Sequence, residues 1–262
     1  MYKKAIMLSI CIVCVIFLAS PPVFALGIEL GGGYWRQDSS GDISYKPVSS
    51  VDTLDINSDL NFGREDRLSG RIKAELPLFL PDIYLMATPM KFEETGSKTV
   101  NFRFGDTMFD VAFPFDTVLK FDIYDVCLFY PVPLLKTATL KVLNAEIGLN
   151  ARIIDFRAEV SGREAVTGER ITESESKVVP VPMIYAGLQL NPVDFLSMEA
   201  EARGIAYSSS HYYDLIGRVK VKPLGPIFIA GGYRYNDIKI DYNDIEASVI
   251  FKGPFIEAGL FF

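Results

Sequence analysis

The chain has few of the residues that most catalytic and metal sites require. It contains one His, one Trp and three Cys among 262 residues. A single imidazole excludes reactions that need two of them and metal sites built on several His ligands. Basic residues number 26 against 33 acidic ones, and a net charge of −7 argues against a nucleic-acid partner. Apolar residues make up 49% of the chain and aromatic residues 13%, so a disordered chain is excluded as well.

The longest apolar run lies near the N-terminus and covers residues 5–19. It follows two lysines, ends before Pro21, and is followed by Val23-Phe24-Ala25, which places small residues where a cleavage site needs them. We therefore predict a secretory signal peptide over residues 1–25 and a mature chain over residues 26–262. The alternative is a retained anchor, for which the run is short, because a helix needs about 20 apolar residues to cross a bilayer.

The cysteines follow from this prediction. Cys11 and Cys14 would leave with the signal peptide, so Cys127 would be the one cysteine of the mature chain. An intrachain disulfide is then excluded, and we interpret Cys127 as an apolar filler within a strand.

The rest of the chain alternates between apolar and polar residues with the period of a β-strand. Segments 67–78, 143–152, 196–203 and 213–222 each have one apolar face and one face rich in full charges. Both a soluble sandwich and a transmembrane barrel show this alternation. The export signal and the connections between strands favour the barrel. Short Pro-rich turns alternate with polar stretches along the chain, and the longest polar stretches cover 39–66, 93–117 and 161–177. Outer-membrane barrels have short periplasmic turns and longer extracellular loops.

The fold prediction is an all-β, transmembrane antiparallel β-barrel of ten strands, with eight as the alternative. Closure is expected because an unpaired backbone group in lipid costs several kcal/mol. The expected strands are 26–38, 67–80, 83–92, 118–130, 138–160, 178–190, 196–207, 212–222, 226–240 and 245–262. Residues 99–104 also alternate and could extend a neighbouring strand above the membrane. In the last strand the apolar parity switches at Lys252-Gly253-Pro254, which predicts a one-residue bulge there.

Several motifs, in order along the chain, resemble an uncharacterised family of signal-bearing bacterial outer-membrane β-barrel proteins of about this length. The motifs are Gly31-Gly32-Gly33, the strand from Asp122 to Tyr130, Glu146 to Arg152, Val181 to Tyr185, Gly231 to Tyr235 and the closing Gly253-Pro254-Phe255. The resemblance implies an outer-membrane barrel and supplies no activity.

The expected hairpin 196–207/212–222 holds the candidate lumen residues. A turn centred between Ser209 and Ser210 would place Glu201 opposite Arg218 and Glu199 opposite Lys220. We orient these charges inward, because Lys or Arg facing lipid near the midplane costs about 2–4 kcal/mol. They would either neutralise one another and plug a narrow barrel or line a polar path or ligand site. A barrel of ten strands is close in size to the small barrels whose interior is filled by side chains, which favours the plug.

Two further clusters have a chemical interpretation and a structural one. His211 follows three serines, Ser208 to Ser210, and could serve a lipid hydrolase, although neighbouring residues rarely have triad geometry and Ser-rich turns are common. Acidic and amide residues at 55, 57, 59 and 61 resemble a calcium loop, but Leu60 stands where that loop has Gly. We favour a polar-faced strand extension with Ile56, Leu60 and Phe62 on its other side.

The functional prediction is an integral protein of the bacterial outer membrane, without enzymatic activity or cofactor. It would bind or pass small solutes or hydrophobic ligands, or serve as a structural membrane component. The alternatives are a lipid-modifying hydrolase using His211, and an adhesion protein that makes contact through loops 39–66 and 161–177. The expected partners are outer-membrane lipid, lipopolysaccharide and, during biogenesis, the barrel assembly machinery, for which the terminal Phe262 resembles the recognition signal.

Overall fold

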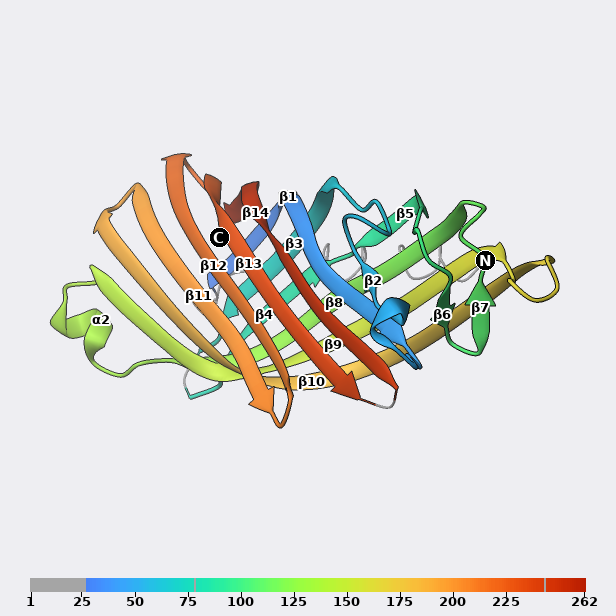
Figure 1. The fold of residues 1–262 in the computed structure, drawn as a ribbon. Helices are drawn as coiled ribbons and strands as arrows, with labels where there is room; N and C mark the ends of the chain where they lie inside the picture. Colours follow the sequence, from blue (N-terminus) through green and yellow to red (C-terminus); the bar gives the residue numbers. More distant parts are fainter. Residues whose placement is uncertain (1–26, 78, 243) are drawn as a thin grey trace, which may run out of the picture.

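Antiparallel pairing along the chain produces one large sheet in the computed structural model, which describes residues 27–77, 79–242 and 244–262 (Figure 1). The predicted signal peptide lies outside the described residues. The ten wall strands are β1 (Gly27–Tyr45), β3 (Arg64–Glu75), β4 (Asp82–Thr88), β8 (Phe115–Pro131), β9 (Leu143–Arg163), β10 (Arg170–Val193), β11 (Leu196–Tyr207), β12 (Ser210–Leu224), β13 (Ile227–Tyr242) and β14 (Ile245–Phe261). The smaller elements are η1 (Ser50–Asp52), β2 (Leu54–Asp55), β5 (Lys91–Gly96), β6 (Phe102–Phe104), β7 (Thr107–Phe109) and α2 (Leu135–Ala138).

The sheet closes where the first strand meets the last. Each wall strand pairs with its sequence neighbours, and β1 pairs with β14 over Glu29–Tyr45. Two backbone hydrogen bonds complete the seam: the Ile28 amide donates to the Phe262 carbonyl (3.1 Å), and the Phe262 amide donates to the Ile28 carbonyl (2.8 Å). The prediction of a closed ten-stranded barrel is confirmed, and the eight-stranded alternative is wrong. Among the described residues, no helix has the length and apolar character needed to cross a membrane.

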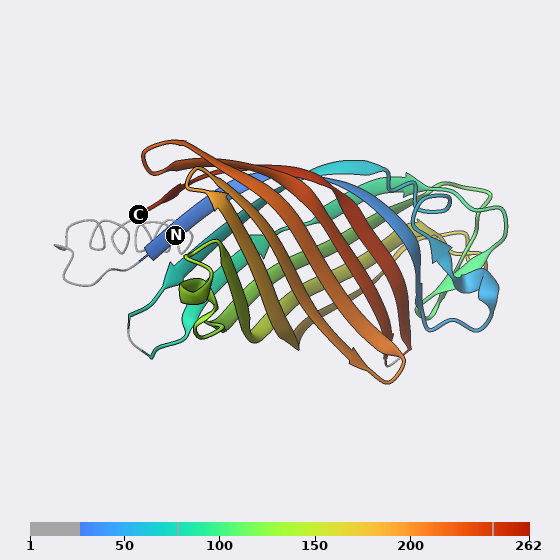
Figure 2. The ribbon, with the colours of Figure 1, turned by 90° about the vertical axis from the view of Figure 1, so that its left-hand side faces the viewer.

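The two ends of the barrel differ (Figure 2). One end carries short turns, α2 and the C-terminus, and we call it the periplasmic end. The opposite, extracellular end carries β2, β5, β6, β7 and η1. The predicted strand 138–160 begins at Leu143 instead, because the one-turn helix α2 and the turn after it occupy residues 135–142.

An apolar belt surrounds the periplasmic half of the wall. Outward-facing residues there are large, apolar and exposed, such as Leu149 (72%) and Ile256 (67%). Further belt residues are Leu68, Ile72, Val126, Leu128, Ile147, Ile184, Leu188, Leu215, Val219 and Ile229. Such a continuous surface is unfavourable in water and matches the hydrocarbon layer of a membrane. The chain is therefore a transmembrane β-barrel.

The polarity of the wall reverses in the extracellular half. In β14 the inward-facing residues there are apolar and buried, as Val249 and Phe251 show, whereas the outward Glu246 and Lys252 are exposed. The register with β13 runs without a shift from Ile227↔Leu260 to Tyr242↔Ile245, so the predicted bulge at Lys252-Gly253-Pro254 is wrong. The parity switch marks the level at which the barrel leaves lipid and enters water, since the outer face must then be polar and the apolar residues turn inward.

Most residues of the predicted extracellular loops belong to wall strands or to segments that cover the extracellular end. Strands β9 and β10 continue to Arg163 and Arg170, which reduces the predicted loop 161–177 to a short turn. Residues 46–63 and 97–114 fold over the extracellular end, and we call them the lid. Residues 99–104 do not extend a wall strand: β6 pairs with β7 in a separate two-stranded sheet. Apolar lid side chains join one buried cluster with the inward-facing wall residues: Leu54, Ile56, Leu60, Phe62, Phe102, Phe104 and Phe109.

Candidate functional site: a charged layer beneath an apolar cavity

Charged side chains fill the lumen at the level of the belt. The cations are Arg71, Lys73, Arg152, Arg203, Arg218, Lys220 and Arg234, and the anions are Glu29, Asp125, Glu146, Glu199, Glu201, Asp214 and Glu257. We call this set the ionic layer. Its cations and anions are equal in number, and each one has at least one oppositely charged partner. A buried charge without such a partner would be strongly unfavourable.

The four predicted lumen residues lie together in this layer. The β11–β12 ladder places Glu199 opposite Arg218 and Ser197 opposite Lys220, which is two residues away from the predicted register. The ion pairs therefore run partly along the diagonal. Arg218 Nη2 lies 2.8 Å from Glu201 Oε1, and Arg218 Nη1 lies 3.4 Å from Glu199 Oε2. Lys220 pairs with Glu199 and also reaches Glu29 on β1 at 2.8 Å, so these strands are linked across the lumen.

The most buried pairs lie next to the extracellular half. Arg152 donates two hydrogen bonds of 2.8 Å to the carboxylate of Asp125 and a third, of 2.5 Å, to Asp214. Arg234 forms a bidentate pair with Asp214 from the other side and lies over the Trp35 ring, 4.6 Å from its centroid. Bidentate guanidinium–carboxylate pairs fix orientation as well as charge, which makes this part of the layer rigid.

Aromatic rings close the spaces between the charges. The Arg203 guanidinium packs against both Tyr84 and Tyr185, at 4.8 and 5.1 Å from the two ring centroids. All three side chains are buried, and Cys127 and Phe129 pack beside the rings. The position of Cys127 fits the filler role expected for it. The lumen at this level is occupied by side chains, as expected for a barrel of few strands.

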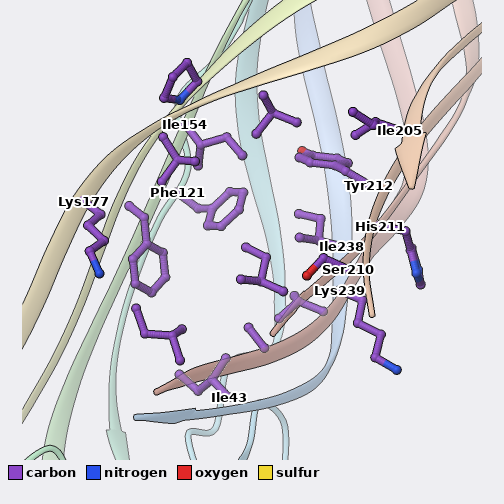
Figure 3. Close-up of a pocket in the computed structure, with 18 of the residues that line it drawn as sticks. Ile43, Phe121, Ile154, Lys177, Ile205, Ser210, His211, Tyr212, Ile238 and Lys239 are labelled. Carbon is purple, nitrogen blue, oxygen red and sulfur yellow. The ribbon is translucent and has the colours of Figure 1, made fainter. Parts of the chain in front are cut away.

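An apolar cavity of about 280 Å³ lies in the extracellular half of the lumen. Residues of eight strands line this cavity, so no single sequence motif predicts it. The strands are β1, β8, β9, β10, β11, β12, β13 and β14. Figure 3 shows apolar residues such as Phe121, Ile154 and Ile238 around an open space, with Lys177, His211 and Lys239 at its periphery. Phe121 and Phe251 belong to the same buried cluster as Trp35, which joins the cavity floor to the ionic layer.

His211 lies on the outer side of the wall near the rim of this cavity. Its Nε2 is 3.2 Å from Asp237 Oδ1, and its ring stacks on Tyr213 with centroids 5.0 Å apart. Ser210 Oγ accepts a hydrogen bond from the Asp241 amide at 3.1 Å. Within the described residues, the hydrogen-bond partner of the imidazole is thus a carboxylate and not one of the neighbouring serines.

The acidic segment at residues 55–61 forms a turn and not the predicted strand extension. Asp55 Oδ1 accepts hydrogen bonds from the amides of Asn57 and Ser58, and Asp59 Oδ2 pairs with Lys98 at 3.1 Å. Ile56, Leu60 and Phe62 are buried on the other side of the segment, where the sequence predicted them. Within the ranges that the structure describes, no group of three or more His, Cys, Asp or Glu residues has a metal-binding arrangement.

The closed sheet, the apolar belt and the charged lumen together define a β-barrel of the outer-membrane class. Solved structures similar to this chain belong to that class. The attachment invasion locus protein Ail of Yersinia pestis, in complex with the heparin analogue sucrose octasulfate, is 11% identical over 91% of this chain and 100% of its own, with a TM-score of 0.31. Neisserial surface protein A is 12% identical over 88% and 95%, with a TM-score of 0.25. The Pseudomonas putida toluene transporter TodX is 8% identical over 92% and 90%, with a TM-score of 0.29.

No family model and no curated protein matches the chain. The resemblance of its motifs to a barrel family therefore stays a prediction. Similarity at these identities and TM-scores carries no functional inference, and the function must be inferred from the lumen itself.

Proposed function

We propose that this barrel binds a small apolar ligand in the extracellular half of its lumen and that the ionic layer prevents passage through the membrane. The observation that carries the proposal is the position of the cavity. A space of about 280 Å³ lined almost entirely by hydrocarbon lies directly above a layer of paired, buried charges. Binding pockets are typically concave and mostly apolar, with a few polar groups at the rim.

The rim and the lining indicate an uncharged ligand. Ile43, Leu119 and Val181 represent the lining, whereas Lys177 and Lys239 stand at the periphery. A charged ligand would lose its hydration inside such a cavity without gaining an ion pair. A hydrocarbon or simple aromatic molecule would lose only unfavourable contact with water.

Energy transfer from the protein to a bound probe tests the proposal. Trp35 is the only Trp of the chain and lies in the same cluster as two cavity residues, Phe121 and Phe251, so it can serve as the donor. The acceptor is 1-N-phenylnaphthylamine, an uncharged fluorophore, added to the barrel in lipid nanodiscs. We expect a saturable transfer signal above the linear background from probe dissolved in lipid.

A pair of substitutions on one strand gives the control. Ala247→Phe fills the cavity from the inner face of β14, whereas Ala258→Phe adds the same ring to the lipid-facing side. The first substitution should weaken the saturable component at least about tenfold, equivalent to about 1.4 kcal/mol, and the second should leave it unchanged. Equal signals from wild type and Ala247→Phe would contradict the proposal.

We also propose that His211 has no catalytic role. The Asp237 contact and the stacking on Tyr213 give the imidazole a structural place on the outer wall. Hydrolysis of lipid A and of phospholipid, assayed with wild type and His211→Ala, checks this. An activity present in wild type and lost in the variant would establish the hydrolase alternative instead.

A further inference from the structure

The wall of the barrel is incomplete beside the cavity. Strands β10 and β11 pair from Val193↔Leu196 up to Ile184↔Gly204, and β11 then turns back at Tyr207. Strand β10 continues to Arg170, paired with β9 along its whole length. Within the described part of the chain, residues 170–183 therefore have no strand beside them on the β11 side, and we call this opening the β10 gap. In Figure 1, β10 runs far past the β11–β12 hairpin.

Two prolines occupy the edge of the β10 gap. The ladder between β9 and β10 runs unbroken through Pro180↔Ile153 and Pro182↔Ala151. A proline cannot donate to a ladder, so the nitrogens of both residues must face away from β9 and into the gap. A non-proline residue at either position would direct an N–H group into the opening.

The location of the prolines explains why those donors are missing. The gap begins at the extracellular border of the apolar belt. Ile184, below the prolines, is exposed apolar surface (63%), whereas Val178, above them, is exposed (66%) and lies opposite the outward-facing Asp155. At that depth an unpaired N–H group costs several kcal/mol, because lipid offers no acceptor. The two prolines therefore remove these donors from the edge, while the carbonyl oxygens of Pro180 and Pro182 still face the gap on the same side as the nitrogens.

The cavity extends to the edge of the β10 gap. In a strand, successive residues face opposite sides of the sheet, so outward-facing residues join the lining only where an edge is open, as His211 and Lys239 do at the last pair of the β12–β13 ladder. The lining of this cavity includes both Val179 and Val181, which face inward, and both Pro180 and Pro182, which face outward. Val179 is 40% exposed despite its inward direction. The opposite rim is formed by the β11–β12 hairpin, through Tyr207 and Ser210.

We propose that the β10 gap is a lateral doorway through which an apolar ligand dissolved in the outer leaflet of the membrane exchanges with the cavity. The proposal rests on the function proposed above and specifies the source of the ligand. The ligand class is an uncharged molecule that partitions into lipid, because the β10 side chains from Val178 to Pro182 beside the gap are apolar.

Closing the doorway with a covalent bridge tests the proposal. If the β10–β11 register were extended beyond Ile184↔Gly204, residue 181 would lie opposite residue 207. The variant V181C/Y207C in a Cys127→Ala background can be bridged across the gap with a short bismaleimide. The matched control is D241C/E246C in the same background. These residues are already paired in the β13–β14 hairpin, so their bridge leaves the gap open.

The readout is the rate at which 1-N-phenylnaphthylamine, added to nanodiscs, produces the saturable Trp35 transfer signal. We expect bridging of V181C/Y207C to slow loading at least tenfold, and protein loaded before bridging to retain its probe. The control bridge should leave the loading rate unchanged. Equal loading rates before and after the gap is bridged, or rapid loss of preloaded probe, would show that the ligand enters from the aqueous side and would overturn the doorway. Absence of the saturable signal in every form, unbridged protein included, would instead contradict the proposed binding function.

Discussion

Arg218 lies directly opposite Glu199 but makes its shorter contact with Glu201, at 2.8 Å against 3.4 Å. The guanidinium thus holds two carboxylates of the same strand, and Lys220 holds one of them from the other side. Charge balance in the lumen depends on such shared contacts more than on separate pairs.

Arg218→Ala should lower the stability of the barrel by about 3–5 kcal/mol, because two buried carboxylates lose a partner while staying buried. Urea unfolding in detergent, followed by the Trp35 fluorescence, measures the effect. Arg36→Ala is the matched control, since the Arg36–Asp66 pair is exposed and should contribute less than about 1 kcal/mol. A midpoint that does not move with Arg218→Ala would mean that the pair contributes nothing to folding.

The ionic layer should make the barrel electrically silent. Arg203, Tyr84 and Tyr185 are buried and pack together in the lumen, so we expect no stable conductance steps from wild type in planar lipid bilayers. Removing two of these side chains, in Tyr185→Ala/Arg203→Ala, should produce measurable ion leakage. Steady conductance from the wild-type barrel would favour transport over binding.

Gly33→Ala should destabilise the seam that closes the barrel. A Cβ atom at this position would lie 2.0 Å from the Ile256 carbonyl oxygen on β14, so the two strands would have to separate. The expected cost is about 1–3 kcal/mol, measured as the unfolding midpoint. Gly217→Ala is the control, because nothing lies within 4 Å of its added Cβ. A similar midpoint for the two variants would show that the seam tolerates the extra volume.

Asp52 should hold the lid together at every pH above its pKa. Burial raises the pKa of this carboxyl, but hydrogen bonds from the amides of Arg103, Val48 and Ser49 outweigh that effect and lower it. Its contribution to lid stability is therefore complete above the ordinary Asp pKa of about 3.9 and is lost only as the pH falls through the lower value in the folded protein.

Hydrogen exchange of the lid amides checks this prediction. Protection of Val48, Ser49 and Arg103 should be constant between about pH 5 and 8 after correction for the intrinsic rate. Asp52→Ala should accelerate their exchange about tenfold or more, because each lost bond to a charged acceptor contributes about 1.5–3 kcal/mol. Unchanged exchange in Asp52→Ala would show that other lid contacts suffice.

The strands and the direction of the charges were predictable because period-two alternation reports burial directly. The exact register of β11 and β12 was not, because Ser208, Ser209 and Ser210 offer equivalent turn positions. The structure centres the turn between Ser208 and Ser209, one residue earlier than predicted, and Ser208 has a φ of 54°. The bulge prediction failed for a different reason. It assumed a single environment along β14, although the strand passes from lipid to water near Lys252.

The cavity could not be read from the sequence, because its residues come from eight wall strands and become neighbours only when the barrel closes. The β10 gap did leave a signal. Pro180 and Pro182 stand two residues apart in the middle of a strand, and neither can donate a hydrogen bond across the edge that its nitrogen faces. Two prolines of one parity therefore indicate which edge of a barrel strand is unpaired.

The reversal of polarity along the wall also fixes how deep the protein sits in its bilayer. Just above the apolar belt, outward-facing charges follow around the circumference, among them Asp66 on β3, Asp155 on β9 and Lys252 on β14. If the barrel moved deeper into the bilayer, several of these charged groups would enter the hydrocarbon layer. If it moved outward, part of the apolar belt would enter water. Bilayers of different thickness should thus deform around this barrel before the barrel shifts within them.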